Sequence, residues 1–299
     1  MRIILTGATG FIGSRLVPML EGAGHSTRIL GRSPRPGLPQ GSGFSIWDPA
    51  KGPPPREALD GCDAVIHLAG EPVAQRWSPE IKRRIRSSRI DVTGQLVEAL
   101  SELSAKPKVL VCASAVGCYG DRGDEVLTES SSAGKGFLAG VCVEWERAAN
   151  AAAGLGLRVV LLRTGIVLGR GGGALERMLP PFRVGLGGKL GSGKQWMPWI
   201  HLDDLCAMIH FAVERPEVQG PLNGTAPNPV RNEEFTRALG RALQRPALIP
   251  VPEFAIRLLY GEMAQIMFAS QRAVPRAALA AGFEFRFPEL FGALKDVLG

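Results

Sequence analysis

Short apolar runs alternate with segments of helical periodicity through the first half of the chain. Six runs are rich in apolar and β-branched residues: residues 2–5, 27–30, 44–47, 64–68, 108–113 and 158–163. Runs of this kind are typical of strands that helices cover on both faces. Between the first two runs, Ile12, Leu16 and Leu20 recur every four residues, which predicts an amphipathic helix. We therefore expect an α/β fold with a doubly wound parallel sheet.

A glycine-rich turn directly follows the first apolar run and opens the first predicted helix. It reads Gly7-Ala8-Thr9-Gly10-Phe11-Ile12-Gly13. Glycines permit a tight turn and let backbone N–H groups approach a pyrophosphate, which the positive end of the helix stabilises. Such a turn can also serve chain reversal alone, but its place at the first strand–helix junction favours dinucleotide binding. We predict a Rossmann-type domain whose first cofactor contacts are Gly7, Thr9, Gly10, Phe11, Ile12 and Gly13.

The end of the second apolar run indicates which dinucleotide is bound. NAD-binding proteins carry an acidic residue about 20 residues past the glycines, where it holds the ribose 2′-hydroxyl. Here the segment holds Gly31, Arg32 and Ser33 and no acid. Gly31 leaves space for a 2′-phosphate and Arg32 can form charge-assisted hydrogen bonds with it, although Arg32 could also be a solvated loop residue. We predict NADP(H) as the cofactor, with Arg32 and Ser33 among the residues that bind it.

The second half of the chain has a different pattern. Glycine-dense stretches mark mobile or closely packed backbone at residues 169–173 and 185–193. Helical periodicity then prevails in three segments: residues 232–244, 253–267 and 275–281. The division that we expect has two parts: a Rossmann domain of residues 1–165 to which residues 194–226 return, and a smaller, mainly helical C-terminal substrate lobe of residues 166–193 and 227–299.

Charge and cysteine content narrow the partners only slightly. The chain has 35 Lys and Arg against 28 Asp and Glu, a net charge of +7 that suits phosphate-bearing ligands or a polyanionic partner. The densest basic stretch falls in a helix predicted for residues 79–100, and without a nucleic-acid motif we interpret it as a solvated helix face. The five cysteines lack metal-ligand spacing, so we expect reduced thiols and no metal. With no membrane-length apolar run and no signal peptide pattern, we expect a cytoplasmic protein.

Five stretches, in order along most of the chain, resemble the extended short-chain dehydrogenase/reductase family, which includes nucleotide-sugar epimerases. They read TGATGFIG at 6–13, AVIHLAG at 64–70, SAVGCYG at 114–120, RTGIVLG at 163–169 and WIHLDD at 199–204. The loop 70–77, the pair Trp145-Glu146 and the segments 270–272 and 282–283 are similar to one subgroup. That subgroup contains poorly characterised bacterial and mitochondrial epimerase-family proteins with a distinct C-terminal domain.

The resemblance implies further cofactor contacts. Trp47 and Asp48 would lie near the adenine, and Glu71 and Arg76 would line the cofactor side of the cleft. A plain salt bridge between Glu71 and Arg76 explains that pair equally well. The remaining residues that the resemblance implies at the cofactor are Leu68, Ala69, Gly70, Ala113, Gly165, Ile166 and Val167.

The catalytic residues of the resembled family are only partly present. That family normally uses a Tyr and a Lys four residues later on the helix after the fifth strand, with a Ser or Thr at the end of that strand. In a register anchored on Glu146, the Tyr and Lys positions fall on Leu138 and Cys142. Lys135, Cys142 and Glu144 could offer substitute proton chemistry, but a lone Cys on such a helix is more often a packing residue.

Two hydroxyl groups remain as catalytic candidates. Ser114 lies at or beside the family's hydroxyl position, and Tyr119 is the tyrosine placed to substitute as proton donor. We interpret His67, inside the fourth apolar run, as a core histidine, whereas His201 follows Trp199 in a loop and could serve function.

The substrate pocket should lie beyond the carboxyl ends of the strands, where ligands of open α/β sheets bind. We expect it between the loop 114–120, the region 169–193 and the C-terminal lobe. Gln195, Trp196 and Trp199 could offer amide and aromatic contacts there, and core packing is the competing explanation for the tryptophans.

The hypothesis that we favour is an NADP(H)-binding oxidoreductase or nucleotide-sugar epimerase-like protein that lacks the usual Tyr and Lys. The missing pair supports an alternative, a catalytically diminished NADP(H)-binding regulatory protein. We expect a small-molecule substrate, with a nucleotide-linked sugar as one candidate, and a homodimer as a compatible assembly. Nucleic acid and membrane are not expected as partners.

Overall fold

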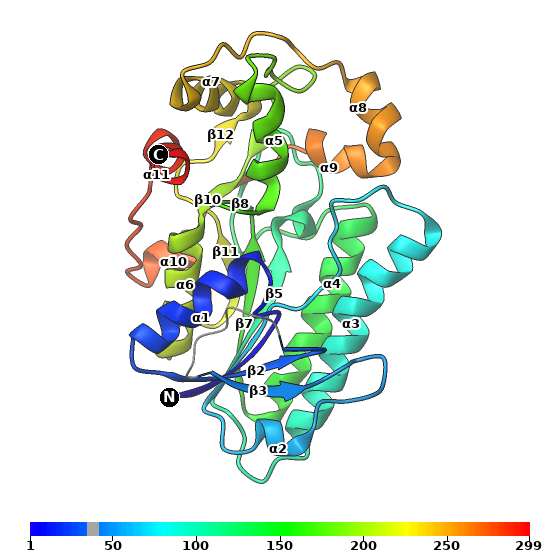
Figure 1. Ribbon diagram of the computed structural model, residues 1–299. Helices are drawn as coiled ribbons and strands as arrows, with labels where there is room; N and C mark the ends of the chain where they lie inside the picture. The colour runs from blue at the N-terminus through cyan, green and yellow to red at the C-terminus, as the bar shows by residue number, and fades with distance from the viewer. Residues whose placement is uncertain (35–41) are drawn as a thin grey trace.

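A seven-stranded parallel sheet forms the centre of the computed structural model, which describes residues 1–34 and 42–299 (Figure 1). Its order is β11-β7-β5-β4-β1-β2-β3. The strands are β1 (Arg2–Thr6), β2 (Ser26–Gly31), β3 (Gly43–Ile46), β4 (Ala64–His67), β5 (Val109–Ala115), β7 (Arg158–Thr164) and β11 (Gly220–Gly224). Each neighbouring pair is parallel. The predicted doubly wound parallel sheet is confirmed, and the strand order reverses between β1 and β4, the switch point where ligands of such sheets bind.

Helices cover both faces of this sheet, as the continuous apolar runs predicted. α1 (Phe11–Gly22) and α6 (Leu202–Glu214) lie on one face, while α3 (Pro79–Ser101) and α4 (Phe137–Asn150) lie on the other (Figure 1). The side chains of β1 show the reason, because Ile3 and Leu5 pack into the core under α1 and α6. Ile4 points the opposite way and joins the core under α3 and α4. Both cores are fully apolar at β1, so neither face of the strand meets water.

The six predicted apolar runs all form strands of the sheet, but the seventh strand was not predicted. β11 (Gly220–Gly224) reads GPLNG, a composition that favours turns. It pairs in parallel with β7 at the edge of the sheet. An edge strand needs backbone pairing on one side alone, so Gly and Pro are tolerated there.

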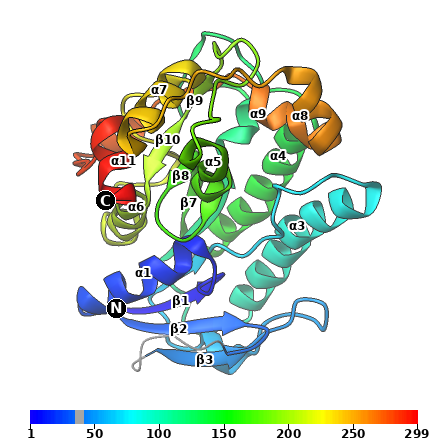
Figure 2. The ribbon, with the colours of Figure 1, turned by 45° about the horizontal axis from the view of Figure 1, so that its top comes forward.

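The rest of the chain packs beyond the carboxyl ends of the strands (Figures 1 and 2). Its helices are α5 (Gly173–Arg183), α7 (Asn232–Leu243), α8 (Glu253–Tyr260), α9 (Ala264–Phe268) and α11 (Leu290–Leu298), while α10 (Arg276–Ala280) packs against the sheet beside α6. Three two-stranded pairs join them: β8 (Ile166–Leu168) with β10 (Trp199–His201), β9 (Trp196–Met197) with β12 (Val230–Arg231), and β6 (Val126–Leu127) with β13 (Arg272–Ala273). A third apolar core holds this part together, with Trp199, Phe235 and Leu294 among its members.

One short α-helix and three 3₁₀-helices complete the helices of the described residues: α2 (Arg56–Leu59), then η1 (Val116–Tyr119), η2 (Ala151–Leu155) and η3 (Gly261–Met263). The helical pattern predicted for residues 253–267 is divided into α8, η3 and α9, because Gly261 adopts φ +61°. Ala278 and Phe283, which follow in the chain, pack into the core under α1 and α6. The C-terminal segment therefore contacts the sheet as well as its own helices.

Two further properties of the described residues are the apolar length of the helices and the state of the cysteines. None of the helices among residues 1–34 and 42–299 is both long and apolar enough to cross a bilayer. All five cysteines are buried and free.

Candidate functional site

The glycine turn between β1 and α1 is packed too tightly for side chains. Gly7 adopts φ +72°, and a Cβ atom there would lie 2.7 Å from the carbonyl carbon of Leu68. A Cβ atom on Gly13 would lie 2.4 Å from the carbonyl oxygen of Gly7. Gly10 is the N-cap of α1, and no side chain caps this end of the helix. The first N–H groups of α1 are thus left for an anion, as the motif predicted.

A cavity of about 550 Å³ opens at this end of α1. The turn contributes Thr9, Gly10 and Phe11, and the loop after β8 contributes residues 169–171. The Phe11 ring packs against that loop, because a Cβ atom on Gly172 would lie 2.6 Å from it. The turn and the loop after β8, far apart in sequence, therefore form one wall each of the same cavity.

His201 is the buried polar residue of this cavity. Its Nδ1 accepts a hydrogen bond from the backbone N–H of Asp203 at 3.1 Å, so the ring proton resides on Nε2. That Nε2 has no hydrogen-bond partner, since Asp296 Oδ2 lies 3.3 Å away outside hydrogen-bond geometry. Burial lowers the pKa of His201. The structure gives this histidine a structural task as N-cap of α6 and leaves one donor at the cavity.

A second cavity of about 220 Å³ lies at the ends of β2 and β3. It brings together Arg32, Trp47 and Asp48, three of the residues predicted to bind the cofactor. The buried Trp47 ring is held by an N–H···O bond of 3.0 Å to the carbonyl of Gly52. Lys51 also lines the cavity and was not predicted. Ser33 is exposed beside Arg32.

Residues at the ends of β4, β5 and β7 border the same edge of the sheet. Leu68 and Ala69 lie against Gly7, and the Ala69 N–H donates to Thr6 Oγ1 at 3.3 Å. Ala113 lies near the end of β5. Gly165 approaches Pro198 so closely that a Cβ atom would lie 2.3 Å from its carbonyl oxygen. Ile166 and Val167 then enter β8.

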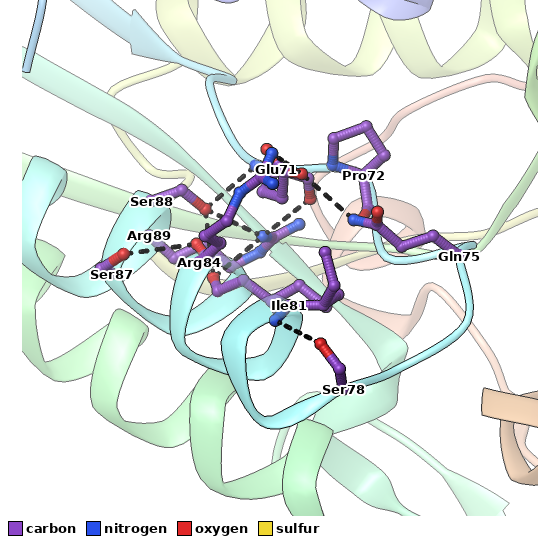
Figure 3. A network of polar contacts seen from close by, with 10 residues as sticks. Glu71, Pro72, Gln75, Ser78, Ile81, Arg84, Ser87, Ser88 and Arg89 are labelled. Atoms are coloured by element: carbon purple, nitrogen blue, oxygen red, sulfur yellow. Dashed lines mark hydrogen bonds and ion pairs between the residues drawn. The ribbon is translucent and has the colours of Figure 1, made fainter. Parts of the chain in front are cut away.

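The loop after Gly70 is tied to α3 through Glu71 (Figure 3). The Glu71 carboxylate accepts from Arg84 at 2.7 Å and from Gln75 at 3.1 Å, and its backbone N–H donates to Ser88 Oγ at 3.0 Å. The considered salt bridge between Glu71 and Arg76 is wrong: Arg84 is the partner. Arg76 is exposed and lies beside Gly261 instead, because Glu71 faces α3.

Ser114 belongs to a buried polar network at the end of β5. Its hydroxyl donates to Glu146 Oε1 of α4 at 2.6 Å. Arg163 of β7 holds both oxygens of that carboxylate, with N–O distances of 2.8 Å. Buried bidentate pairs of this kind are strong only when both partners remain. Sequence reasoning missed Glu146 and Arg163 as a pair, although an arginine within an apolar run was a usable signal.

Tyr119 lies in the same network and does not face a cavity. Its hydroxyl is 2.7 Å from Asn223 Oδ1 and 3.0 Å from the carbonyl of Thr128, and it accepts from Arg163 at 3.0 Å. The side chain is fully buried, and burial raises the pKa of Tyr119 to about 12. This placement argues against the predicted role of Tyr119 as proton donor to a substrate, because its hydroxyl proton is used in hydrogen bonds to Asn223 and Thr128 in the core.

The helix that should carry a Tyr and a Lys presents Leu138 and Cys142 in the register that we anchored on Glu146. Cys142 is buried, and burial raises the pKa of its thiol to about 11. Glu144 pairs with Arg86, and Lys135 is exposed. None of these three side chains is placed as an obvious proton donor at the sheet edge.

Other residues considered from the sequence have structural tasks. His67 is buried between Thr6 and Thr93, with hydrogen bonds of 2.7 and 3.1 Å, which confirms the interpretation as a core histidine. Trp199 is fully buried, so core packing is the correct explanation for it. Gln195 is also buried and donates to backbone carbonyls. Burial therefore leaves neither Gln195 nor Trp199 free for a ligand. Trp196 is half-buried and stacks with Arg231 and Arg272.

One group of side chains in the described part of the chain could hold a metal ion. His25, His210 and Glu214 bring their ligand atoms within 4.8 Å of one another. His25 directly precedes β2 at the amino edge of the sheet, opposite the glycine turn. The group is thus remote from both cavities.

Comparisons with known proteins agree with this geometry. Residues 3–223 match the model of the NAD dependent epimerase/dehydratase family, and residues 251–297 match a domain of unknown function (DUF1731). The Arabidopsis thaliana protein named epimerase family protein SDR39U1 homolog, chloroplastic, is 44% identical over 308 residues, which cover 100% of this chain and 87% of that protein.

Two solved structures share the fold over nearly the whole chain. The crystal structure of human epimerase family protein SDR39U1 (isoform 2) with NADPH is 37% identical, with a TM-score of 0.88 and 99% of each chain covered. A nucleoside-diphosphate sugar epimerase from Corynebacterium glutamicum is 36% identical, with a TM-score of 0.81. That match covers 100% of this chain and 58% of the other.

Proposed function

Because the chain belongs to the NAD dependent epimerase/dehydratase family, we propose that it is an NADP(H)-dependent oxidoreductase or epimerase-like enzyme. Its substrate is a small molecule, and a nucleotide-linked sugar is the class that the name of the Corynebacterium glutamicum relative supports. Human SDR39U1 was crystallised with NADPH, which supports the same cofactor here. Residues 1–165 with 194–226 bind the cofactor, and residues 166–193 with 227–299 bind the substrate.

The observation that carries the proposal is the cavity at the ends of β2 and β3. Arg32 and Lys51 supply two positive charges there for a 2′-phosphate, and Trp47 and Asp48 offer an aromatic surface and an acceptor for an adenine. The uncapped start of α1 then receives the pyrophosphate. These residues fit NADP(H) in charge and in order along the sheet edge.

The chemistry that the cofactor supplies is hydride transfer from or to the nicotinamide. The protein would position the reacting groups at the carboxyl edge of the sheet, beyond the ends of β4 and β5. The Ser114 hydroxyl donates its hydrogen bond to Glu146 and Tyr119 lies in the core, so the chain offers little acid–base help there. General acid–base catalysis is typically worth about a hundredfold to ten-thousandfold in rate, so turnover should be slow.

Calorimetric titration of the protein with NADPH and with NADH tests the cofactor assignment. A charge-assisted contact of about 1.5–3 kcal/mol predicts about tenfold to a hundredfold tighter binding of NADPH. Equal affinities, or a preference for NADH, contradict the assignment.

A second function is favoured by the buried hydroxyl of Tyr119 and by the apolar Leu138. The chain would then be a catalytically diminished NADP(H)-binding protein with a regulatory role. Incubation with a panel of nucleotide sugars separates the two, when NADPH oxidation is followed in one series and formation of an epimeric sugar with added NADP⁺ in another. Turnover of any member supports the enzyme, whereas tight NADPH binding without turnover supports the regulatory protein.

We further propose a cytoplasmic location and a homodimeric assembly. Cell fractionation tests the first, and light scattering on the purified protein tests the second.

A further inference from the structure

Arg89 of α3 differs from the other basic residues of its helix. The solvated helix face predicted from the sequence is confirmed for three arginines, Arg83, Arg84 and Arg86, which are exposed. The side chain of Arg89, in contrast, is largely buried. Its Nη1 donates to the carbonyl oxygens of Glu71 and Ile85 at 3.0 and 3.1 Å and contacts Ser88 Oγ at 3.3 Å. All three acceptors are neutral. Within the described part of the chain, no carboxylate lies close enough to form an ion pair with Arg89.

The guanidinium of Arg89 keeps donors for a ligand. Of its five N–H groups, those on Nε and Nη2 form no hydrogen bond with the described residues. Both nitrogens are in contact with solvent, because the buried polar atoms without a partner are found elsewhere in the described residues. A mostly buried cation without a direct ion-pair partner is costly, and an incoming acceptor group offsets that cost.

The position of this guanidinium is fixed by its neighbours. A Cβ atom on Gly70 would lie 3.2 Å from Arg89 Cζ and 3.3 Å from Nη2, so the absence of a side chain at Gly70 makes the space. On another side, the Trp145 ring of α4 lies 5.1 Å from Cζ. Figure 3 shows Arg89 beside Ser88, under the loop that holds Glu71. A side chain held in this way loses little conformational entropy when it binds a ligand.

Gly70 marks which part of the dinucleotide Arg89 would meet. The cavity with Arg32 lies at the ends of β2 and β3, and the glycine turn follows β1. A dinucleotide that starts in that cavity and crosses the switch point continues over β4 and β5. Gly70 follows β4 there, so the nicotinamide nucleotide half would pass Arg89.

We propose that Arg89 binds the nicotinamide nucleotide half of NADP(H), through hydrogen bonds from Nε and Nη2 to its ribose or phosphate oxygens. This assignment rests on the proposed NADP(H) binding. It gives the cofactor two separate cationic contacts, Arg32 with Lys51 at the adenosine half and Arg89 at the other half.

Two ligands separate these contacts. NADPH reaches both halves, whereas adenosine 2′,5′-bisphosphate carries the adenosine half and the 2′-phosphate alone. Arg89→Gln should weaken NADPH by about tenfold to a hundredfold, the range for a lost charged hydrogen bond. The same variant should bind the bisphosphate as the wild type does. Arg83→Gln, an exposed residue of the same helix, is the matched control and should change neither affinity.

The outcomes are distinguishable by calorimetry with a thermal melt of each variant. Equal losses for both ligands indicate a structural role for Arg89 and overturn the assignment, as does an unchanged affinity for NADPH. If Arg89→Gln does not fold, Arg89→Lys keeps the positive charge but removes the planar set of donors, and should give a selective loss of NADPH in the same direction, although a smaller one. A wild-type protein that fails to bind adenosine 2′,5′-bisphosphate contradicts the proposed function itself.

Discussion

Arg32 and Lys51 provide the positive charge of the cavity at the ends of β2 and β3. Arg32→Ala should weaken NADPH by about tenfold to a hundredfold, because a charge-assisted contact of about 1.5–3 kcal/mol is lost. NADH, which has no 2′-phosphate, should bind with unchanged affinity. Lys51→Ala should act in the same direction with a smaller loss, because Lys is a flexible point charge. Titration of each variant with both cofactors measures the effect, and a parallel loss for NADH would contradict it.

The buried hydroxyl of Tyr119 should matter for stability and little for chemistry. Tyr119→Phe leaves Asn223 Oδ1 and one Arg163 donor without this partner in the core, which should cost about 1–3 kcal/mol of the free energy of unfolding. Turnover per folded molecule, once a substrate is known, should be unchanged. Urea unfolding measures the first quantity. A large loss of turnover with normal stability would instead return Tyr119 to the list of catalytic candidates.

At the scale of elements, the start of α1 depends on Gly13. A Cβ atom there would meet the carbonyl oxygen of Gly7 at 2.4 Å, so Gly13→Ala must move the turn that faces the pyrophosphate. We expect both NADPH affinity and stability to fall, the latter by about 1–3 kcal/mol, as for overpacked sites.

Gly22→Ala is the matched control on the same helix. Nothing lies within 4 Å of a Cβ atom at Gly22, and its φ is not positive. Alanine is the better helix former by about 1 kcal/mol, so this variant should be as stable as the wild type or more so. Thermal melts and NADPH titration of both variants test the pair. Similar losses in both would show that the tight turn at Gly13 is not the cause.

At the scale of the whole molecule, His67 links stability to pH. Burial lowers its pKa to about 4 in the folded protein, from an ordinary value of about 6.5. The unfolded chain therefore binds the proton more readily, so stability present above about pH 6.5 is lost as the pH falls toward about 4. The complete loss amounts to about 3 kcal/mol, of which about 2 kcal/mol should appear by about pH 5.

Urea unfolding at about pH 7.5 and about pH 5 measures this dependence. His67→Gln removes the titrating group, so the variant should lose about 2 kcal/mol less than the wild type between the two conditions. His25 and His201 also have lowered pKa values and leave a smaller dependence of the same sign. An identical loss in the variant and the wild type would exclude His67 as its main source.

Six of the seven strands of the central sheet, the helix predicted for residues 79–100 and the glycine turn could be predicted from the sequence. β11 could not, because GPLNG owes its extended form to backbone pairing with β7. Arg32, Trp47 and Asp48 were selected individually, and the structure places them around one cavity. Lys51 was missed because no motif in the sequence includes it, and its place beside Arg32 depends on how the chain after β3 folds back.

What the sequence determined by itself is local: apolar periodicity sets each strand and helix, and the glycines set the turn that opens α1. These features depend on neighbours within a few residues, so their pattern can be read along the chain. Only the tertiary structure decided that Tyr119 is buried with Arg163 and that Arg89 lies against Gly70. In both cases the deciding contacts join residues from different elements, and burial of a polar or charged group depends on all the elements that pack around it.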